Sequence, residues 1–216
     1  TAESVALTRE AESVGVDAVM QVVPYYNKPT QEGLYNHFKS IADSTRLPCI
    51  LYNVPGRTIT SMSVETTLRL SKIPNIIGVK EASGDFDQIA KIISGAPTGF
   101  LVWSGNDSDT FGVMSLGGYG VVGVATHVIG KRVKEMVVSM TDGRIQEAAV
   151  AHKEMLAFFK GIFVVSNPIP IKYLLNRVGL YVGKPRLPLM EPDEKMASFL
   201  DDLLGQYTVD LPVEVV

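Results

Sequence analysis

The sequence contains one cysteine in 216 residues, and its charges nearly balance. A single thiol, at Cys49, cannot form a disulfide within the chain, so we expect a reducing, cytoplasmic compartment. Lys and Arg number 20 against 23 Asp and Glu, which gives a net charge of −3. The charges are spread along the chain without a basic stripe, and this argues against nucleic acid as a partner.

Long apolar runs, low-complexity tracts and short repeats are also missing. The sequence has no apolar run of about 18 residues and no stretch typical of a signal peptide, so we expect no membrane span. With 46% apolar and 20% charged residues, the composition is that of a folded protein with a sizeable core. The opening stretch TAESVALTREAESVG is already helical in its spacing, and we expect further sequence upstream of it.

Strand-like and helix-like segments alternate through the first part of the chain. The strand-like segments are rich in Val and Ile and nearly continuous in apolar character, which is typical of parallel strands buried on both faces. They are residues 17–23, 48–54, 75–80, 99–104 and 120–125. The helical segments between them are residues 31–45, 64–72, 86–94 and 108–116. This alternation predicts an α/β fold with a parallel sheet, either open or closed into a barrel.

After residue 125 the alternation ends and only helical patterns follow. Helices are predicted at residues 131–140, 145–160, 168–178 and 192–204. We therefore predict two regions, a β/α region at residues 1–130 and a C-terminal helical region at residues 131–216.

Residues that favour helix ends support several of these boundaries. Thr30, Ser63 and Asp85 each precede a helical segment, and their side chains are of the type that caps a helix N-terminus. Gly95 and Gly117 follow helical segments and are predicted to stop them.

Polar residues gather where the strand-like segments end. The ends read VVPYYNKP, LYNVPGRT, GVKEAS, WSGND and VVGVATH, whereas the segments begin with few polar residues. In parallel β/α folds the catalytic residues lie at the carboxyl ends of the strands, so we expect a site there. The glycines of LGGYGVVG precede a strand rather than opening a helix, so we interpret them as turn glycines and not as a phosphate-binding loop.

Lys80 ends the apolar segment NIIGVKEAS, where burying an ammonium group is costly. One interpretation is that Lys80 lies just beyond the strand and pairs with a carboxylate such as Glu81. If Lys80 instead points inward, with Gly78 leaving space for its stem, burial lowers its pKa and makes a neutral amine available. A neutral amine is what attack on a ketone requires to form a Schiff base.

Tyr52 and Arg57 are expected at the same edge of the sheet as Lys80. Tyr52 lies at the end of the preceding strand, and neighbouring strands are about 4.8 Å apart, so its phenol can meet the amine. A phenol can shuttle the protons that iminium chemistry moves. Arg57 follows VPG in a predicted loop, and a guanidinium suits bidentate capture of a carboxylate. The three groups predict a carbonyl substrate that carries a carboxylate, such as a keto-acid.

Four motifs in this order resemble the pyruvate-dependent class I aldolase family, the group of dihydrodipicolinate synthase and N-acetylneuraminate lyase. They are PYYNKPTQEGLYNHF at residues 24–38, LYNVPGRT at 51–58, GVKEASGD at 78–85 and NPIPIK at 167–172. The resemblance runs through nearly the whole chain, and YNVPGRT is similar to the dihydrodipicolinate synthase branch. It implies condensation of pyruvate with L-aspartate 4-semialdehyde in lysine and diaminopimelate biosynthesis, without a metal or organic cofactor.

The resemblance also implies roles for individual residues. Lys80 would be the Schiff-base lysine for pyruvate, with the Tyr52 phenol above it. Tyr26 would reach across a dimer interface into the proton relay of a neighbouring subunit. Gly105 and Val122 match positions whose backbone carbonyl groups line the pocket.

The same resemblance implies how Arg57 acts and how the chain assembles. Arg57 would bind the carboxylate of the aldehyde substrate, and the active unit would be a dimer of dimers. Tyr25 and Glu3 fall where feedback-inhibited relatives hold free lysine, although Glu3 could equally be a solvated helix residue.

Two departures from the family pattern stand out. The upstream G-x-T-G-E segment is absent, so by the family pattern the first three strands of a (β/α)8 TIM barrel are not in this sequence. Ile59 follows GRT, where glycine is usual, and could alter the segment that aims Arg57. The alternatives are another lyase of the family that acts on a sugar keto-acid, and a truncated, non-catalytic scaffold. A phosphate-binding barrel enzyme is a weaker alternative, because the sequence lacks a glycine-rich anion nest.

Overall fold

The computed structural model describes residues 1–210, and residues 211–216 at the end of the predicted helical region lie outside them. The chain divides into two compact units, of which the first is Thr1–Val122 and the second begins at Gly123.

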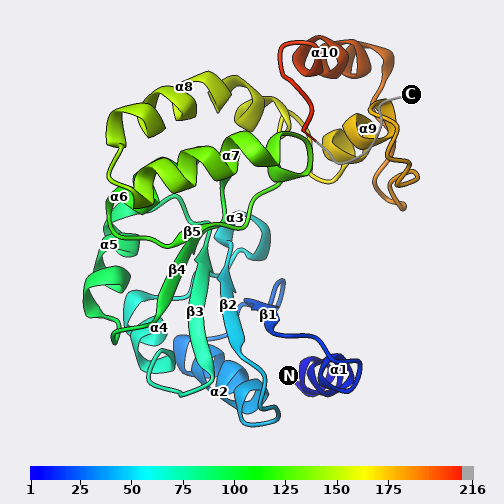
Figure 1. The fold of residues 1–216 in the computed structure, drawn as a ribbon. Helices are drawn as coiled ribbons and strands as arrows, with labels where there is room; N and C mark the ends of the chain where they lie inside the picture. Colours follow the sequence, from blue (N-terminus) through cyan, green and yellow to red (C-terminus); the bar gives the residue numbers. More distant parts are fainter. Residues whose placement is uncertain (211–216) are drawn as a thin grey trace. The chain divides into compact units, whose positions relative to one another are not determined.

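The first unit is built on a parallel sheet, as the alternation predicted (Figure 1). Within the described residues, five strands lie in the order β1-β2-β3-β4-β5. They are β1 (Val19–Val22), β2 (Cys49–Asn53), β3 (Ile76–Glu81), β4 (Leu101–Ser104) and β5 (Gly120–Val121). Every neighbouring pair of strands is parallel. The α/β prediction is therefore confirmed, but the strand predicted at residues 120–125 is shorter and ends at Val121.

Helices follow the strands of this unit along the chain. They are α1 (Ala2–Ser13), α2 (Gln31–Ala42), α4 (Val64–Leu70), α5 (Phe86–Gly95) and α6 (Thr110–Ser115), with a 3₁₀ turn η1 at Asp107–Asp109. The predicted N-caps Thr30, Ser63 and Asp85 are confirmed, because each side chain accepts a hydrogen bond from a backbone N–H of its own helix. Gly117 has a positive φ of 101° just after α6, as a helix-stopping glycine does.

One face of the sheet is packed against helices α2, α4, α5 and α6. Its strands contribute Leu51, Val79 and Val102 to a core that includes Phe38 of α2 and Ile92 of α5. Side chains alternate along a strand, so the residues between these point to the opposite face. That opposite face carries Tyr52 and Lys80.

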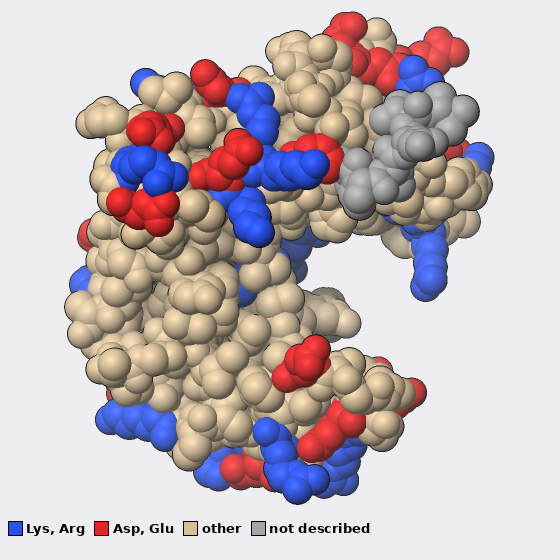
Figure 2. Space-filling view, viewed as in Figure 1, with Lys and Arg blue, Asp and Glu red and all other residues tan. Residues whose placement is uncertain are grey.

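The second unit is helical, as predicted from the sequence. Its helices are α7 (Thr126–Thr141), α8 (Ile145–Gly161), α9 (Ile169–Arg177) and α10 (Glu194–Leu204). Helix α7 begins earlier than the predicted residue 131 and has a non-helical residue at Ile129. Acidic and basic side chains lie next to one another over α7 and α8 (Figure 2), and Arg132 pairs there with Glu154. This mixture agrees with the absence of a basic stripe in the sequence.

Candidate active site

Tyr52 and Lys80 lie side by side at the carboxyl ends of β2 and β3. The two residues are register partners in the parallel pairing of these strands. The Lys80 Nζ atom lies 4.2 Å from the centre of the Tyr52 ring. Of the two interpretations of Lys80, the structure agrees with the inward one. The amine lies over the Tyr52 ring, on the face of the sheet opposite the helices.

Glu81 does not lie on the Lys80 side of the strand. Its carboxylate accepts hydrogen bonds from the Asn53 amide, the Ser83 backbone N–H and the Gln88 amide. Gln88 belongs to α5, so the carboxylate is directed toward the helices. The pairing of Lys80 with Glu81 that the sequence left open is consequently not found.

Burial lowers the pKa of Lys80, which favours the neutral amine. The carboxylate of Asp107 opposes this shift, and the positive charge of Arg57 adds to it. Asp107 is fully buried at the start of η1. Sequence reasoning did not single out Asp107, although the motif WSGND that contains it was recognised as a polar strand end.

Burial also raises the pKa of Tyr52, and Arg57 acts in the opposite direction by favouring the phenolate. A phenol whose pKa is raised stays protonated near neutral pH and can donate its proton. Lys80 and Tyr52 thus form a pair in which burial favours a neutral amine beside a neutral phenol. This pair can exchange protons with a substrate oxygen.

Arg57 lies on a short helix rather than in the loop that was predicted. Helix α3 (Pro55–Thr58) follows directly on β2, with Pro55 at its first position (Figure 1). The Thr58 hydroxyl lies within hydrogen-bond distance of two carbonyl oxygens, those of Thr60 at 2.8 Å and Val54 at 3.1 Å, and donates its single proton there. Helix α3 ends at Ile59, which has a left-handed φ of 67°. A β-branched residue adopts this φ only with strain, whereas glycine adopts it readily.

Gly105 is packed against the Lys80 side chain. Its backbone N–H donates to the Glu81 carbonyl oxygen at 2.7 Å. A Cβ atom at this position would lie 3.2 Å from Lys80 Cε and 2.6 Å from Ala82 Cβ. Val122 follows β5, and its N–H donates to the Ser104 carbonyl oxygen at the end of β4. The structure thus places both Gly105 and Val122 at the carboxyl ends of strands, and any side chain at position 105 would meet the lysine stem.

Trp103 occupies the space that was predicted for the lysine stem. It is the register partner of Lys80 on β4. A Cβ atom at Gly78 would lie 2.6 Å from the Trp103 ring and would also meet the Leu101 carbonyl oxygen. Gly78 therefore makes room for Trp103 and the backbone of β4, and the prediction that it makes room for Lys80 was wrong.

Tyr25, Tyr26 and Glu3 are not brought to Lys80 within this chain. Tyr25 and Tyr26 follow β1 and are 69% and 88% exposed. Tyr26 has a positive φ of 71°, so the chain turns sharply where it presents this ring. Glu3 lies exposed in the first turn of α1.

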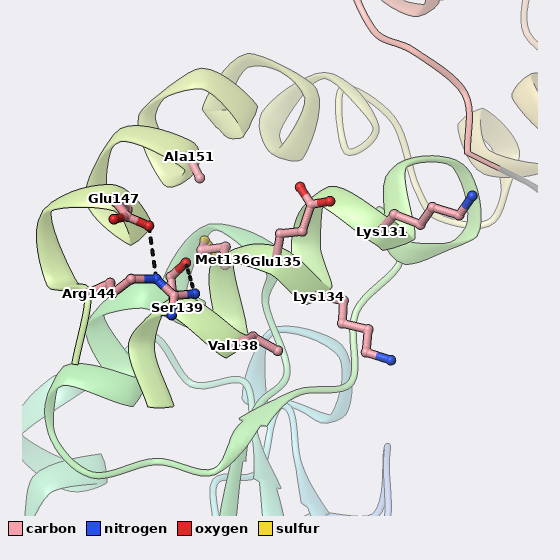
Figure 3. Close-up of a pocket in the computed structure, with 9 residues that line it drawn as sticks. All are labelled: Lys131, Lys134, Glu135, Met136, Val138, Ser139, Arg144, Glu147 and Ala151. Atoms are coloured by element: carbon pink, nitrogen blue, oxygen red, sulfur yellow. Dashed lines mark hydrogen bonds and ion pairs between the residues drawn. The ribbon is translucent and has the colours of Figure 1, made fainter. Parts of the chain in front are cut away.

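A separate pocket of about 560 Å³ lies between α7 and α8 in the second unit. Figure 3 shows Lys131, Lys134 and Glu135 projecting from α7, and Arg144 held by Glu147 and Ser139. It contains none of the residues predicted for the site.

The described residues offer neither a cluster of metal ligands nor a membrane-spanning helix. Residues 1–210 contain no group of three or more His, Cys, Asp and Glu side chains that could hold a metal ion. Among the helices of the same residues, each is too short or too polar to cross a bilayer.

The chain is similar to known proteins over nearly its whole length. Residues 1–207 match the dihydrodipicolinate synthetase family. A 4-hydroxy-tetrahydrodipicolinate synthase of Dehalococcoides mccartyi is 57% identical over 99% of this chain and 72% of the relative. The synthase of Moorella thermoacetica is 52% identical over 94% of this chain and 70% of the relative.

Solved structures agree with these matches. Dihydrodipicolinate synthase of Aquifex aeolicus has a TM-score of 0.93 at 39% identity, over 97% of this chain and 72% of the other. The synthase of Acinetobacter baumannii, solved in complex with pyruvate, has a TM-score of 0.90 at 39% identity, over 94% of this chain and 69% of the other.

Proposed function

Because this chain belongs to the dihydrodipicolinate synthetase family and has the activity of a 4-hydroxy-tetrahydrodipicolinate synthase, we propose that it works through a Schiff base on Lys80. The observation that carries the proposal is the contact between the Lys80 amine and the Tyr52 ring, 4.2 Å apart, at the end of two parallel strands. The lowered pKa of Lys80 supports it, because only the neutral amine is a nucleophile.

In the first half-reaction the Lys80 nitrogen attacks the ketone carbon of pyruvate. The nitrogen loses a proton while the carbonyl oxygen takes one up, which gives a carbinolamine. A further proton lets the oxygen leave as water, which produces the protonated imine (iminium). The Tyr52 phenol would supply and recover these protons, and the 4.2 Å between its ring centre and the Lys80 amine supports this role. Loss of a methyl proton then converts the iminium into a neutral enamine, whose terminal carbon is the nucleophile of the second half-reaction.

In the second half-reaction the enamine carbon attacks the aldehyde carbon of L-aspartate 4-semialdehyde. We assign Arg57 to the carboxylate of this substrate. The effect of its charge on the pKa of both Tyr52 and Lys80 supports this assignment. Charge-assisted hydrogen bonds from a guanidinium to a carboxylate are strong and directional. Gly105 and Val122 would line the pocket with their backbone carbonyl groups.

A panel of aldehydes tests the assignment of Arg57. The wild-type enzyme should condense pyruvate with L-aspartate 4-semialdehyde much faster than with an aldehyde of similar length that lacks the carboxylate. Arg57→Ala should lose this preference, which corresponds to about 2–3 kcal/mol for one charge-assisted contact, and should still bind pyruvate covalently. If Arg57→Ala fails to form the pyruvate adduct, Arg57 belongs to the first half-reaction. If a sugar keto-acid is the better substrate, the alternative lyase activity is the correct one.

The proposal extends to the rest of the molecule. The five-stranded sheet of residues 1–130 would be the C-terminal part of a (β/α)8 barrel. The helices of residues 131–216 would form a C-terminal region. The TM-scores of 0.93 and 0.90 to dihydrodipicolinate synthases support this. A cytoplasmic location rests on the lone, buried Cys49.

Assembly and regulation belong to the same proposal. Tyr26 would complete the site of a neighbouring subunit in a dimer of dimers, and its exposure and sharp turn support such a role. Glu3 and Tyr25 would bind free lysine, with the carboxylate taking the ammonium of the ligand. The related synthase of Cyanidioschyzon merolae has been solved with lysine bound. Lysine inhibition that disappears in Glu3→Ala would support this site, and insensitivity at tens of millimolar lysine would rule it out.

A further inference from the structure

Behind the proposed active site, Asn53 and Glu81 form a buried pair on the helix-facing side of the sheet. Their exposed fractions are 0% and 1%. The Asn53 amide nitrogen lies 3.1 Å from both carboxylate oxygens of Glu81. A carboxylate buried to this degree is costly unless it accepts several hydrogen bonds, so the pair is a specific arrangement rather than a chance contact.

Further hydrogen bonds satisfy the Glu81 carboxylate. The Ser83 backbone N–H donates to it at 2.8 Å and the Gln88 amide at 3.2 Å. Burial raises the pKa of Glu81, and the hydrogen bonds from Asn53, Ser83 and Gln88 oppose that shift. The carboxylate therefore connects β2, β3 and the first turn of α5.

Asn53 also holds the segment that returns from α3. Its side-chain oxygen accepts a hydrogen bond from the Met62 backbone N–H at 2.9 Å. Its amide nitrogen lies 3.4 Å from the Ser61 hydroxyl. Because Arg57 lies on α3, between β2 and Ser61, Asn53 fixes both ends of the short segment that carries the guanidinium.

The pair is adjacent in sequence to the proposed catalytic residues. Asn53 follows Tyr52, and Glu81 follows Lys80. In the sheet, Tyr52 is the register partner of Lys80 and Asn53 is the register partner of Glu81. Side chains of consecutive strand residues point to opposite faces. A hydrogen bond between Asn53 and Glu81 on one face thus sets the relative height of the phenol and the amine on the other.

We infer that Asn53 and Glu81 are positioning residues for the reaction: their buried hydrogen-bonded pair fixes Tyr52 against Lys80 and holds the α3 segment that aims Arg57. The inference rests on the Lys80 mechanism proposed above. Reacting groups must be held within a fraction of an ångström, and a misplacement of about 1 Å can cost about 100-fold in rate. A buried hydrogen-bonded pair resists displacement, because moving either partner would leave polar groups without hydrogen bonds away from water.

Exchanging the carboxylate and the amide between the two positions tests the inference. In Asn53→Asp two buried carboxylates face each other, and in Glu81→Gln an amide N–H₂ group replaces one of the oxygens that accept from Asn53, Ser83 and Gln88. In the double variant Asn53→Asp/Glu81→Gln the new amide donates to the new carboxylate, which can still accept from the Met62 N–H. The pair then keeps one carboxylate and one amide, with their places reversed.

Each single variant should lower kcat and the rate of pyruvate adduct formation about 10- to 100-fold, as loss of supporting hydrogen bonds does around other sites. The double variant should recover to within about threefold of the wild type. Asn53→Ser shortens the side chain by one bond, so the hydroxyl no longer reaches either the Met62 N–H or the Glu81 carboxylate. It adds no second buried carboxylate, so it serves if Asn53→Asp does not fold, and it should lower kcat and the rate of adduct formation about 10- to 100-fold.

Asn75→Asp is the matched control. The Asn75 amide donates to the carbonyl oxygens of Ala42, Thr45 and Leu47 at the opposite end of β3, so a carboxylate there should lower the melting temperature without changing kcat or KM. If the Asn53 and Glu81 variants behave like this control, with lower stability but normal kinetics per folded molecule, the pair is only structural and the inference is wrong. A wild-type enzyme that forms no adduct would instead refute the Lys80 mechanism, whatever the variants do.

Discussion

Replacing Gly105 with alanine should displace the Lys80 side chain and slow the reaction. The added Cβ atom would lie 2.6 Å from Ala82 Cβ, 3.1 Å from the Glu81 carbonyl oxygen and 3.2 Å from Lys80 Cε. Carbon atoms pack without strain at about 3.5–4.0 Å, so the contact with Ala82 is short by about 0.9 Å and that with Lys80 by about 0.3 Å. Lys80 lies at the end of β3 and Ala82 follows that strand directly, so the crowding falls on the segment that carries the amine.

The backbone around Gly105 has little freedom to relieve this crowding. The Gly105 N–H donates to the Glu81 carbonyl oxygen at 2.7 Å, and the Ala82 N–H donates to the backbone carbonyl oxygen of Asn53. Overpacking of this kind costs about 1–3 kcal/mol of stability. A displacement of the amine approaching 1 Å costs up to about 100-fold in rate, so we expect kcat to fall about 10- to 100-fold while the protein remains folded.

The assay compares Gly105→Ala with Gly56→Ala. Gly56 lies on α3 close to the same edge, but a Cβ atom there would meet nothing within 4 Å, so this variant should retain its activity. Condensation rate and the rate of pyruvate adduct formation are measured for both, with circular dichroism to verify folding. A Gly105→Ala enzyme with wild-type values of both rates would refute the packing of Gly105 against Lys80 as a functional constraint.

Two further predictions concern the electrostatics and the strain of the site. Asp107 raises the pKa of Lys80 and Arg57 lowers it. Asp107→Asn should therefore move the pH dependence of adduct formation to lower pH, and Arg57→Ala should move it to higher pH. Shifts in the same direction would contradict the opposite effects of the two charges on Lys80. Ile59 is 67% exposed and has a φ of 67°, so Ile59→Gly removes strain and little buried surface. Relief of about 1–2 kcal/mol against a loss of about 0.5–1 kcal/mol through chain entropy predicts a small gain in stability, and a lower melting temperature would show that the strain estimate is wrong.

The sheet and its helices could be predicted from the sequence because their signals are local. Apolar runs marked the strands, and Thr30, Ser63 and Asp85 marked the helix starts by hydrogen bonds to their own helices. The end of β5 was misplaced at Ala125 instead of Val121, because an apolar run does not reveal where pairing stops. Helix α3 was missed because four residues are too few for a periodic pattern.

The candidate site was only partly predictable. The ends of the apolar runs sufficed to bring Tyr52 and Lys80 to the same edge of the sheet, because parallel strands have their carboxyl ends at one edge. The filling of the space at Gly78 by Trp103, and the pairing of Glu81 with Asn53, depend on the register between strands. Register is not encoded in any single segment, so these contacts required the structure.

Covalent trapping tests the central claim of this account most directly. The enzyme, in the longest form available, is incubated with pyruvate and borohydride, digested, and analysed by mass spectrometry. We predict the mass of one reduced pyruvyl adduct per chain, located on the peptide that contains Lys80, and no adduct and negligible turnover in Lys80→Ala. An adduct on another lysine, or near-normal turnover by Lys80→Ala, would contradict the mechanism.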